Sequence, residues 1–136
     1  MMNFDTKIKV ILRDDLATWQ ALNVTAFLMS GLGATQNIVG ELYQDASGVQ
    51  YLPMSQQPIM VHQADRATLL ELLQSANQKE MAVAIYTEEL FKTYNDVDNR
   101  AEIAKHETSN LNLVGIAIRG KKNAVDKLTK GIALHS

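Results

Sequence analysis

Hydrophobic and polar residues alternate over residues 6–12, and this period of two, with its β-branched side chains, predicts a strand. Asp14 or Asp15 directly after the strand is suited to cap a helix, which we expect over residues 16–30. Four apolar residues at helical spacing form the predicted buried stripe of this helix: Trp19, Leu22, Ala26 and Met29. Two glycines predict its end: Gly31 and Gly33.

The remaining chain alternates short apolar runs with amphipathic segments. Residues 38–43 and 49–52 flank the turn-forming residues 45–48, which predicts a hairpin or a strand pair at a sheet edge. Apolar runs predict three more strands: residues 59–63, 81–86 and 111–118. Helical segments are expected to follow these strands: residues 65–77, a turn from residue 88, residues 100–106 and residues 123–129.

This order of strands and helices predicts an α/β fold with a mixed sheet and helices on both faces. The length of 136 residues suits one domain, and neither a repeat nor a linker divides the chain, so we expect a single domain over residues 1–136. Gly115 lies inside the last predicted strand. A glycine there indicates a close approach by another backbone or a ligand.

Composition narrows the classes of function. The chain contains no cysteine, which excludes disulfides, thiol nucleophiles and thiolate metal sites. No apolar run is long enough to cross a bilayer, so we expect a soluble, cytoplasmic protein that does not associate with membranes. Three histidines lie far apart and match no metal-ligand spacing: His62, His106 and His135. We therefore expect neither a metal nor a cofactor.

Basic residues gather at the end of the chain. Residues 105–136 carry six Lys or Arg against two acidic residues, although the whole chain has a net charge of -2. Four lysines are the candidates for contact with phosphate or RNA: Lys121, Lys122, Lys127 and Lys130. Lysines beside a last helix more often form a solvated face, and we favour that interpretation.

The densest polar cluster follows the first predicted strand. Carboxyl ends of strands in open α/β sheets are common ligand sites, so Arg13, Asp14 and Asp15 mark a candidate site. Asp15 is a helix cap, a general base or an anchor for a ligand. Arg13 is either paired with a neighbouring aspartate, the interpretation we favour, or a forked donor for a carboxylate or phosphate.

Two residues on the first helix extend this candidate site. Trp19 is the only tryptophan; on a helical stripe it is more often a core residue than a stacking surface for a planar ligand. Asn23 lies one turn later in an apolar segment. A buried amide without a partner costs about 1–3 kcal/mol, so Asn23 is expected to find a partner or face a polar cavity.

Three segments resemble the type II peptidyl-tRNA hydrolases: ILRDDL, DRATLLELLQSANQKEMAVAIYTEELFKT and LVGIAIRGKKNAVDKLTKGIAL. They cover about two thirds of the chain in the same order. Within that superfamily, TWQALNVTAFLMSGLG is more similar to an uncharacterised bacterial branch, the domain-of-unknown-function family numbered two thousand. The resemblance implies a mixed sheet of four strands in a peptidyl-tRNA hydrolase II-like fold, and a homodimer.

The resemblance does not extend to the hydrolase activity. The hydrolases carry lysines at the first turn and a glutamine and a histidine farther along the helix. The matching segment here, ATWQALNVTAFLMS, has no lysine, no histidine and no glutamine at the middle of the helix. The aspartate after a later strand is also replaced, by the run Tyr86, Thr87 and Glu88. Loss of one stabilising donor alone costs roughly 100- to 1,000-fold in rate, so ordinary peptidyl-tRNA hydrolysis is not expected.

Three hypotheses of function follow. The favoured one is a binding protein for a small polar or nucleotide-like ligand at the end of the first strand, held by Arg13, Asp14, Trp19 and Asn23. The second is a diverged ester or amide hydrolase acting on aminoacyl or peptidyl conjugates, with Asp15 as the catalytic residue that places water. The third is a dimeric interaction protein without a small-molecule site.

Overall fold

The structure is a computed structural model that describes residues 4–136. Its strands are β1 (Thr6–Arg13), β2 (Tyr43–Gln44), β3 (Gln50–Tyr51), β4 (Ile59–Ala64), β5 (Ala82–Thr87) and β6 (Leu113–Lys121). Its α-helices are α1 (Thr18–Thr35), α2 (Arg66–Gln78), α3 (Asp96–Ala104) and α4 (Lys122–Leu128). Two 3₁₀ helices complete the set: η1 (Glu88–Lys92) and η2 (Thr108–Asn110).

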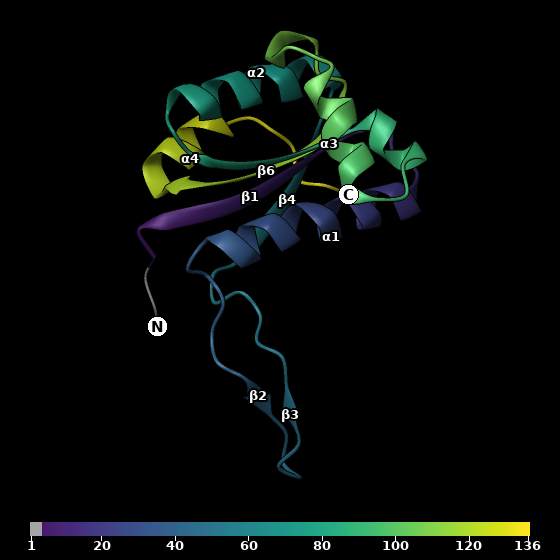
Figure 1. The fold of residues 1–136 in the computed structure, drawn as a ribbon. Helices are drawn as coiled ribbons and strands as arrows, with labels where there is room; N and C mark the ends of the chain where they lie inside the picture. The colour runs from purple at the N-terminus through teal and green to yellow at the C-terminus, as the bar shows by residue number, and fades with distance from the viewer. Residues whose placement is uncertain (1–3) are drawn as a thin grey trace.

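Four strands form one mixed sheet in the order β4-β1-β6-β5. Strand β1 is parallel to β4, while β6 runs antiparallel to both β1 and β5. Helix α1 covers one face of the sheet, and α2 and α4 cover the other (Figure 1). The predicted α/β fold with a mixed four-stranded sheet and helices on both faces is therefore confirmed.

The alternation within β1 explains how the two layers are held together. Ile8, Val10 and Leu12 point to the α1 side of the sheet, where they join one buried apolar cluster. Ile11 points to the other side and joins the cluster under α2 and α4. All four side chains are at most 2% exposed, so β1 forms the centre of both cores.

Helix α1 differs from its predicted form at both ends and in its buried face. It begins at Thr18, after an Ala17 whose N–H donates to Gln20 Oε1 at 3.0 Å, so neither aspartate caps it. Both glycines that were expected to end it lie within it: Gly31 and Gly33. Its buried residues are not those of the predicted stripe but Ala21, Val24, Leu28 and Leu32.

The buried face of α1 was mispredicted because the helix carries no charged residue on either side. Without a polar face, a helical period in the apolar positions does not indicate which side meets the sheet. Trp19 is 61% exposed and Leu22 is 69% exposed, so the predicted core role of Trp19 is wrong. Asn23 is also exposed rather than buried, and its amide is open to water.

Gly115 on β6 makes room for side chains of α1, rather than for the backbone or ligand that the sequence led us to expect. A Cβ atom at this position would lie 2.8 Å from Val24 Cγ1 and 3.2 Å from Leu28 Cδ1, both on α1. These distances are shorter than ordinary van der Waals contacts. The missing side chain on β6 therefore lets α1 pack directly against the centre of the sheet.

The end of the chain covers the outer edge of β4. Gln63 N–H donates to Ala133 O at 3.0 Å, and His135 N–H donates to Val61 O at 2.9 Å. His62 anchors this segment from inside: its Nδ1 lies 3.1 Å from Ile132 O, and its Nε2 lies 3.0 Å from the Lys9 ammonium. Together these bonds pair a strand edge that would otherwise be open.

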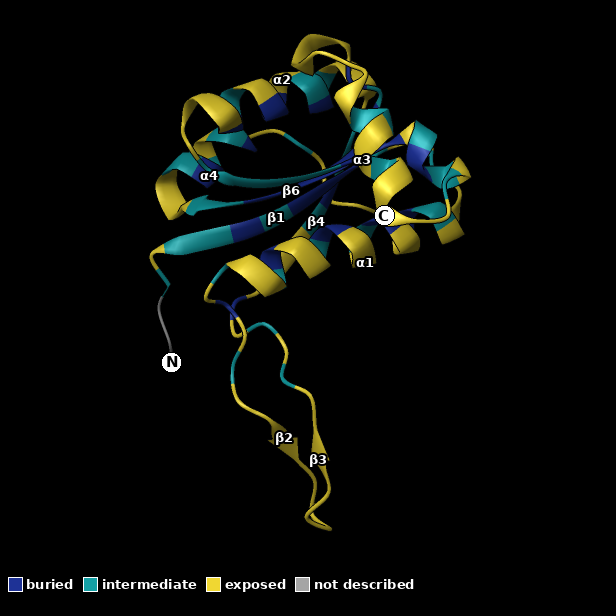
Figure 2. Ribbon diagram, viewed as in Figure 1, coloured by how far each residue is buried: buried dark blue, intermediate teal, exposed yellow. Residues whose placement is uncertain are grey.

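The predicted hairpin is confirmed, but it stands away from the sheet. Strands β2 and β3 pair with each other and form an arm, residues 39–55, that projects from the body of the molecule (Figure 1). Every residue from 41 to 52 is exposed, as the yellow colour of the arm shows (Figure 2). Within residues 4–136, no helix is long and apolar enough to span a membrane.

Candidate functional site

Charged side chains at the carboxyl ends of β1 and β5 bind one another. Arg13 Nε donates to Asp15 Oδ1 at 2.5 Å, and Arg13 Nη1 donates to Glu88 Oε2 at 3.4 Å. Asn112 Nδ2 donates to the same Glu88 oxygen at 3.0 Å. Arg13 is thus paired with its neighbours, as the favoured interpretation had it, and its side chain is only 14% exposed.

These contacts set the charge of the cluster. The hydrogen bond from Arg13, followed by that from Asn112, holds the pKa of Glu88 below its ordinary value. Asp14 has a different role: its backbone N–H donates to Ala64 O, which ties the end of β1 to β4, and its side chain is exposed. The cluster is therefore a structural tie between strand ends.

An open groove of about 340 Å³ lies between α1 and the segment from η1 to α3. We call it the aromatic groove. Its walls combine aromatic rings with amide and carboxylate side chains. The lining residues are Trp19, Asn23, Phe27, Tyr86, Leu90, Phe91, Thr93, Tyr94, Asn95, Asp96 and Asn99.

The aromatic wall of this groove is continuous. The rings of Trp19 and Phe91 meet edge to face with centroids 5.7 Å apart. Phe91 continues to Tyr86 at 5.2 Å, and Tyr86 continues to Phe27 at 6.0 Å. Burial raises the pKa of the Tyr86 phenol, which keeps it neutral. Such ring pairs hold one another in place, so the exposed part of Trp19 is a pre-formed surface.

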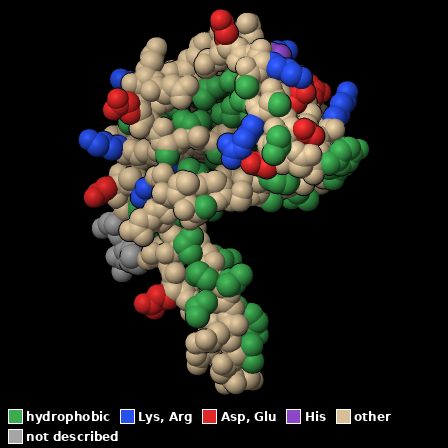
Figure 3. All heavy atoms as spheres, in the orientation of Figure 1, with side chains coloured by type: hydrophobic (Ala, Val, Ile, Leu, Met, Phe, Trp, Pro, Cys, Tyr) green, Lys and Arg blue, Asp and Glu red, His purple; other side chains and the backbone are tan. Residues whose placement is uncertain are grey.

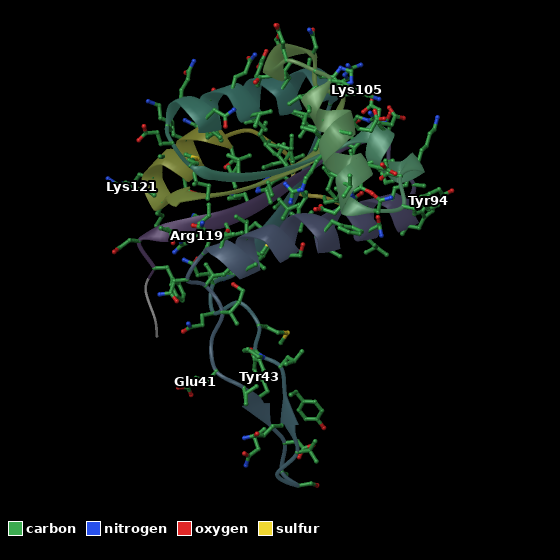
Figure 4. All side chains as sticks on the ribbon, in the orientation of Figure 1. Glu41, Tyr43, Tyr94, Lys105, Arg119 and Lys121 are labelled. Carbon is green, nitrogen blue, oxygen red and sulfur yellow. The ribbon has the colours of Figure 1, made fainter. Side chains whose placement is uncertain are left out.

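The amide side chains of the groove come from the start of α3 and from α1. Asn95 caps α3: its Oδ1 accepts from Asp98 N at 2.8 Å. Asn99 Oδ1 accepts from the Thr93 hydroxyl, which leaves its amide nitrogen as a donor. Asn23 lies on α1 between Trp19 and Phe27, one helical turn from each, and is exposed. Tyr94 lies at this end of the molecule and points outward, 97% exposed (Figure 4).

The structure separates the residues that the sequence grouped together. Trp19 and Asn23 line the aromatic groove, whereas none of Arg13, Asp14 and Asp15 is among its lining residues. The role of Asp15 as a catalytic base stays a prediction. Residues 91–99 also contribute to the groove but were not predicted to belong to the site, although their run of aromatic and amide side chains was an available signal.

Other polar surfaces lie outside this groove. A hollow of about 380 Å³ lies near the start of β1 and includes Lys7, Lys9 and Lys122, but Lys7 is paired with Asp126 at 2.6 Å. The four candidate lysines for RNA contact are exposed, and Lys121 lies at the opposite end of the molecule from Tyr94 (Figure 4). Among residues 4–136, no three His, Asp or Glu side chains lie close enough together to hold a metal ion.

Fold and groove together define an α/β protein with a mixed four-stranded sheet and an aromatic groove at one end of α1. Residues 6–136 match the model of a family described as proteins of unknown function, DUF2000, and the chain belongs to this family. The predicted family is thereby confirmed. No curated protein matches the chain.

A solved structure shows the same fold. It is that of a protein of unknown function, Atu0240, from Agrobacterium tumefaciens strain C58. It is 46% identical to this chain, with a TM-score of 0.93, and the match covers 98% of this chain and 100% of that one. The relation to the type II peptidyl-tRNA hydrolases stays a prediction.

Proposed function

We propose that the protein binds a small, planar, polar ligand of the nucleobase type in the aromatic groove. One observation carries this proposal: aromatic rings that contact one another and amide side chains line the same open groove. Aromatic rings supply stacking surfaces, and amides supply paired donors and acceptors that suit the edge of a heterocycle. The groove thus offers both contacts that a nucleobase uses.

The energetics favour a stacked ligand. Stacking of one base on an aromatic side chain is worth roughly 1–3 kcal/mol, and Trp19 has most of its ring exposed for such a contact. Each hydrogen bond to Asn23 or Asn99 adds about 1 kcal/mol. Together these contacts amount to roughly 3–5 kcal/mol, which corresponds to binding in the millimolar to submillimolar range.

Charge in the groove favours the base or nucleoside over a phosphate bound at the same place. Asp96 lines the groove and is paired with Arg100, Nε to Oδ2, at 2.9 Å. This pair is exposed, so it contributes little net positive field. A phosphate is therefore expected to extend out of the groove rather than to anchor the ligand.

The hydrolase hypothesis receives less support than the binding hypothesis. Asp15 is 64% exposed and accepts a hydrogen bond from Arg13, whose guanidinium also binds Glu88. A general base needs a reacting group within about 2.6–3.2 Å, and the groove that would hold a substrate does not include Asp15. We therefore propose binding without a catalytic role for Asp15.

Trp19 provides the direct test, because it is the only tryptophan and lines the groove. The experiment is a fluorescence titration with adenosine, guanosine, cytidine and uridine. We expect a saturable change with at least one of them, with an affinity weakened about 5-fold in Asn23→Ala. The control is Asn123→Ala on α4, an exposed asparagine outside the groove lining, which leaves the affinity unchanged. The absence of a saturable change with all four nucleosides would overturn the proposal.

A further inference from the structure

The arm, residues 39–55, exposes apolar side chains along its whole length. Figure 3 shows hydrophobic side chains gathered on the arm and continuing to where it joins the body. Six large ones are between 48% and 82% exposed: Leu42, Tyr43, Val49, Tyr51, Leu52 and Met54. An isolated two-stranded hairpin is marginally stable in water, so this arm needs a surface to cover it.

The arm is nevertheless built as an ordered element. Asp45 Oδ1 accepts from the N–H groups of Ser47 and Val49 at 2.9 and 3.1 Å, and its Oδ2 accepts from the Tyr51 hydroxyl at 2.7 Å. Gly48 supplies the positive φ of 83° that the turn requires. A pre-formed arm loses little conformational entropy when it docks.

Helix α1 presents a second uncovered surface next to the arm. Its outer face contains Leu22, Ala26 and Ser30, all exposed, and the whole helix has no charged residue. Surface helices ordinarily carry charges on the face opposite the core. A helix without them is typical of an element buried on both sides, so α1 also needs a covering surface.

The arm and the outer face of α1 lie next to each other, because the arm projects from the body close to the end of α1 (Figure 1). We propose that a second copy of this chain covers both: the arm of each copy packs on the outer face of α1 of the other. A two-fold dimer of this kind is self-complementary, since each chain supplies one arm and one helix face. This interface does not depend on a ligand in the aromatic groove.

The exposed apolar area suits such a dimer. The large hydrophobic side chains of the arm and of the α1 face expose together on the order of 1,000 Å², at roughly 150–250 Å² for each fully exposed large side chain. A stable interface buries about 800 Å² per partner. The charges are also compatible with this contact, because the arm has only Glu41 and Asp45, and α1 has no charge that would repel them.

The test is sedimentation equilibrium over micromolar to submillimolar concentrations, with Leu52→Glu on the arm and Leu22→Glu on α1. We expect a dimer for the unchanged protein and a dissociation constant raised on the order of 30-fold or more in each variant. Both positions are outside the core, and circular dichroism checks that each variant is folded.

The matched control is Val97→Glu on α3, which places the same charge on another exposed apolar residue. It is expected to leave the dimer unchanged. A monomer at every concentration in the unchanged protein would overturn the proposal, as would a Leu52→Glu variant that dimerises as tightly as the unchanged protein. Neither result would bear on the nucleoside titration of Trp19, so the two proposals fail separately.

Discussion

Gly115 is the residue on which the packing of α1 against the sheet most directly depends. A methyl group at this position would lie 2.8 Å from Val24 Cγ1 and 3.0 Å from Leu12 Cδ2, so Gly115→Ala forces buried side chains apart. We expect the free energy of unfolding to fall by about 1–3 kcal/mol. Urea denaturation measures this difference.

Gly31 supplies the opposite control on α1. A Cβ there would lie 3.9 Å from Ala84 Cβ, which is an ordinary contact. Because alanine is the better helix former, Gly31→Ala is expected to raise the free energy of unfolding by about 0.5–1 kcal/mol. If Gly115→Ala were as stable as the unchanged protein, the close contact with α1 would be contradicted.

Glu88 is expected to contribute to the loss of stability in acid. Its pKa is lowered in the folded state by the hydrogen bonds from Arg13 and Asn112. The stabilisation is therefore present above the ordinary value of 4.5 and is lost as the pH falls through the folded value. We expect Glu88→Gln to lose less stability than the unchanged protein as the pH falls from about 5 to about 3, a range that brackets the ordinary pKa of a carboxylate. Thermal melting across this range checks the prediction, which identical profiles would contradict.

Part of the candidate site could be predicted from single residues. Trp19 and Asn23 were identified because an indole and an amide near a strand end are unusual enough to attract attention. Asn95 and Asn99 were not, because they lie in a polar segment far along the chain whose contact with α1 arises only in the folded molecule. Pairing between distant segments leaves no local signal in one sequence.

The edge formed by β4 and the end of the chain carries a pH-dependent contact. Burial lowers the pKa of His62, and Lys9 nearby lowers it further, although the hydrogen bond that His62 Nδ1 donates to Ile132 O raises it. The fold therefore favours the neutral form of His62. Its contribution to stability is present above the ordinary pKa of 6.5 and is lost as the pH falls toward the lower pKa of the folded state. Protonation would place a second positive charge beside Lys9.

We therefore expect the segment at residues 133–135 to detach more readily in mild acid. Hydrogen exchange at the amide of His135, which bonds to Val61 O, reports this opening directly. Protection corrected for intrinsic rates should fall between about pH 7 and pH 5.5, the range around the ordinary histidine value. In His62→Gln the protection should not depend on pH; constant protection in the unchanged protein would contradict the account.

At the scale of elements, the strands and helices were largely predictable, because their periods and turn residues are local properties. The error in α1 has a physical cause: an 18-residue helix without a charged residue presents apolar positions all round. The absence of charged residues prevented the buried face from being predicted, and it also indicates a helix that is covered on both faces. The arm was predicted as a hairpin but not as a projection, because nothing local sets its distance from the sheet.

The whole molecule combines a rigid body, a groove and an arm. The groove lies where α1 meets the segment before α3, and the arm follows the other end of α1, so one helix contributes to both surfaces. A ligand in the groove and a second copy on the arm are therefore compatible. We expect the dimer to form with or without nucleoside, which sedimentation in the presence of saturating nucleoside checks; dissociation on adding it would show that the two surfaces compete.

The central claim is that the aromatic groove binds a planar polar ligand. It is tested most directly by nuclear magnetic resonance of the side-chain amides during titration with the nucleosides. We predict that the resonances of Asn23, Asn95 and Asn99 shift together and saturate, because all three amides line the groove. The claim would be contradicted if no resonances shifted, or if the shifts left these amides unchanged and occurred instead around the hollow at Lys7, Lys9 and Lys122.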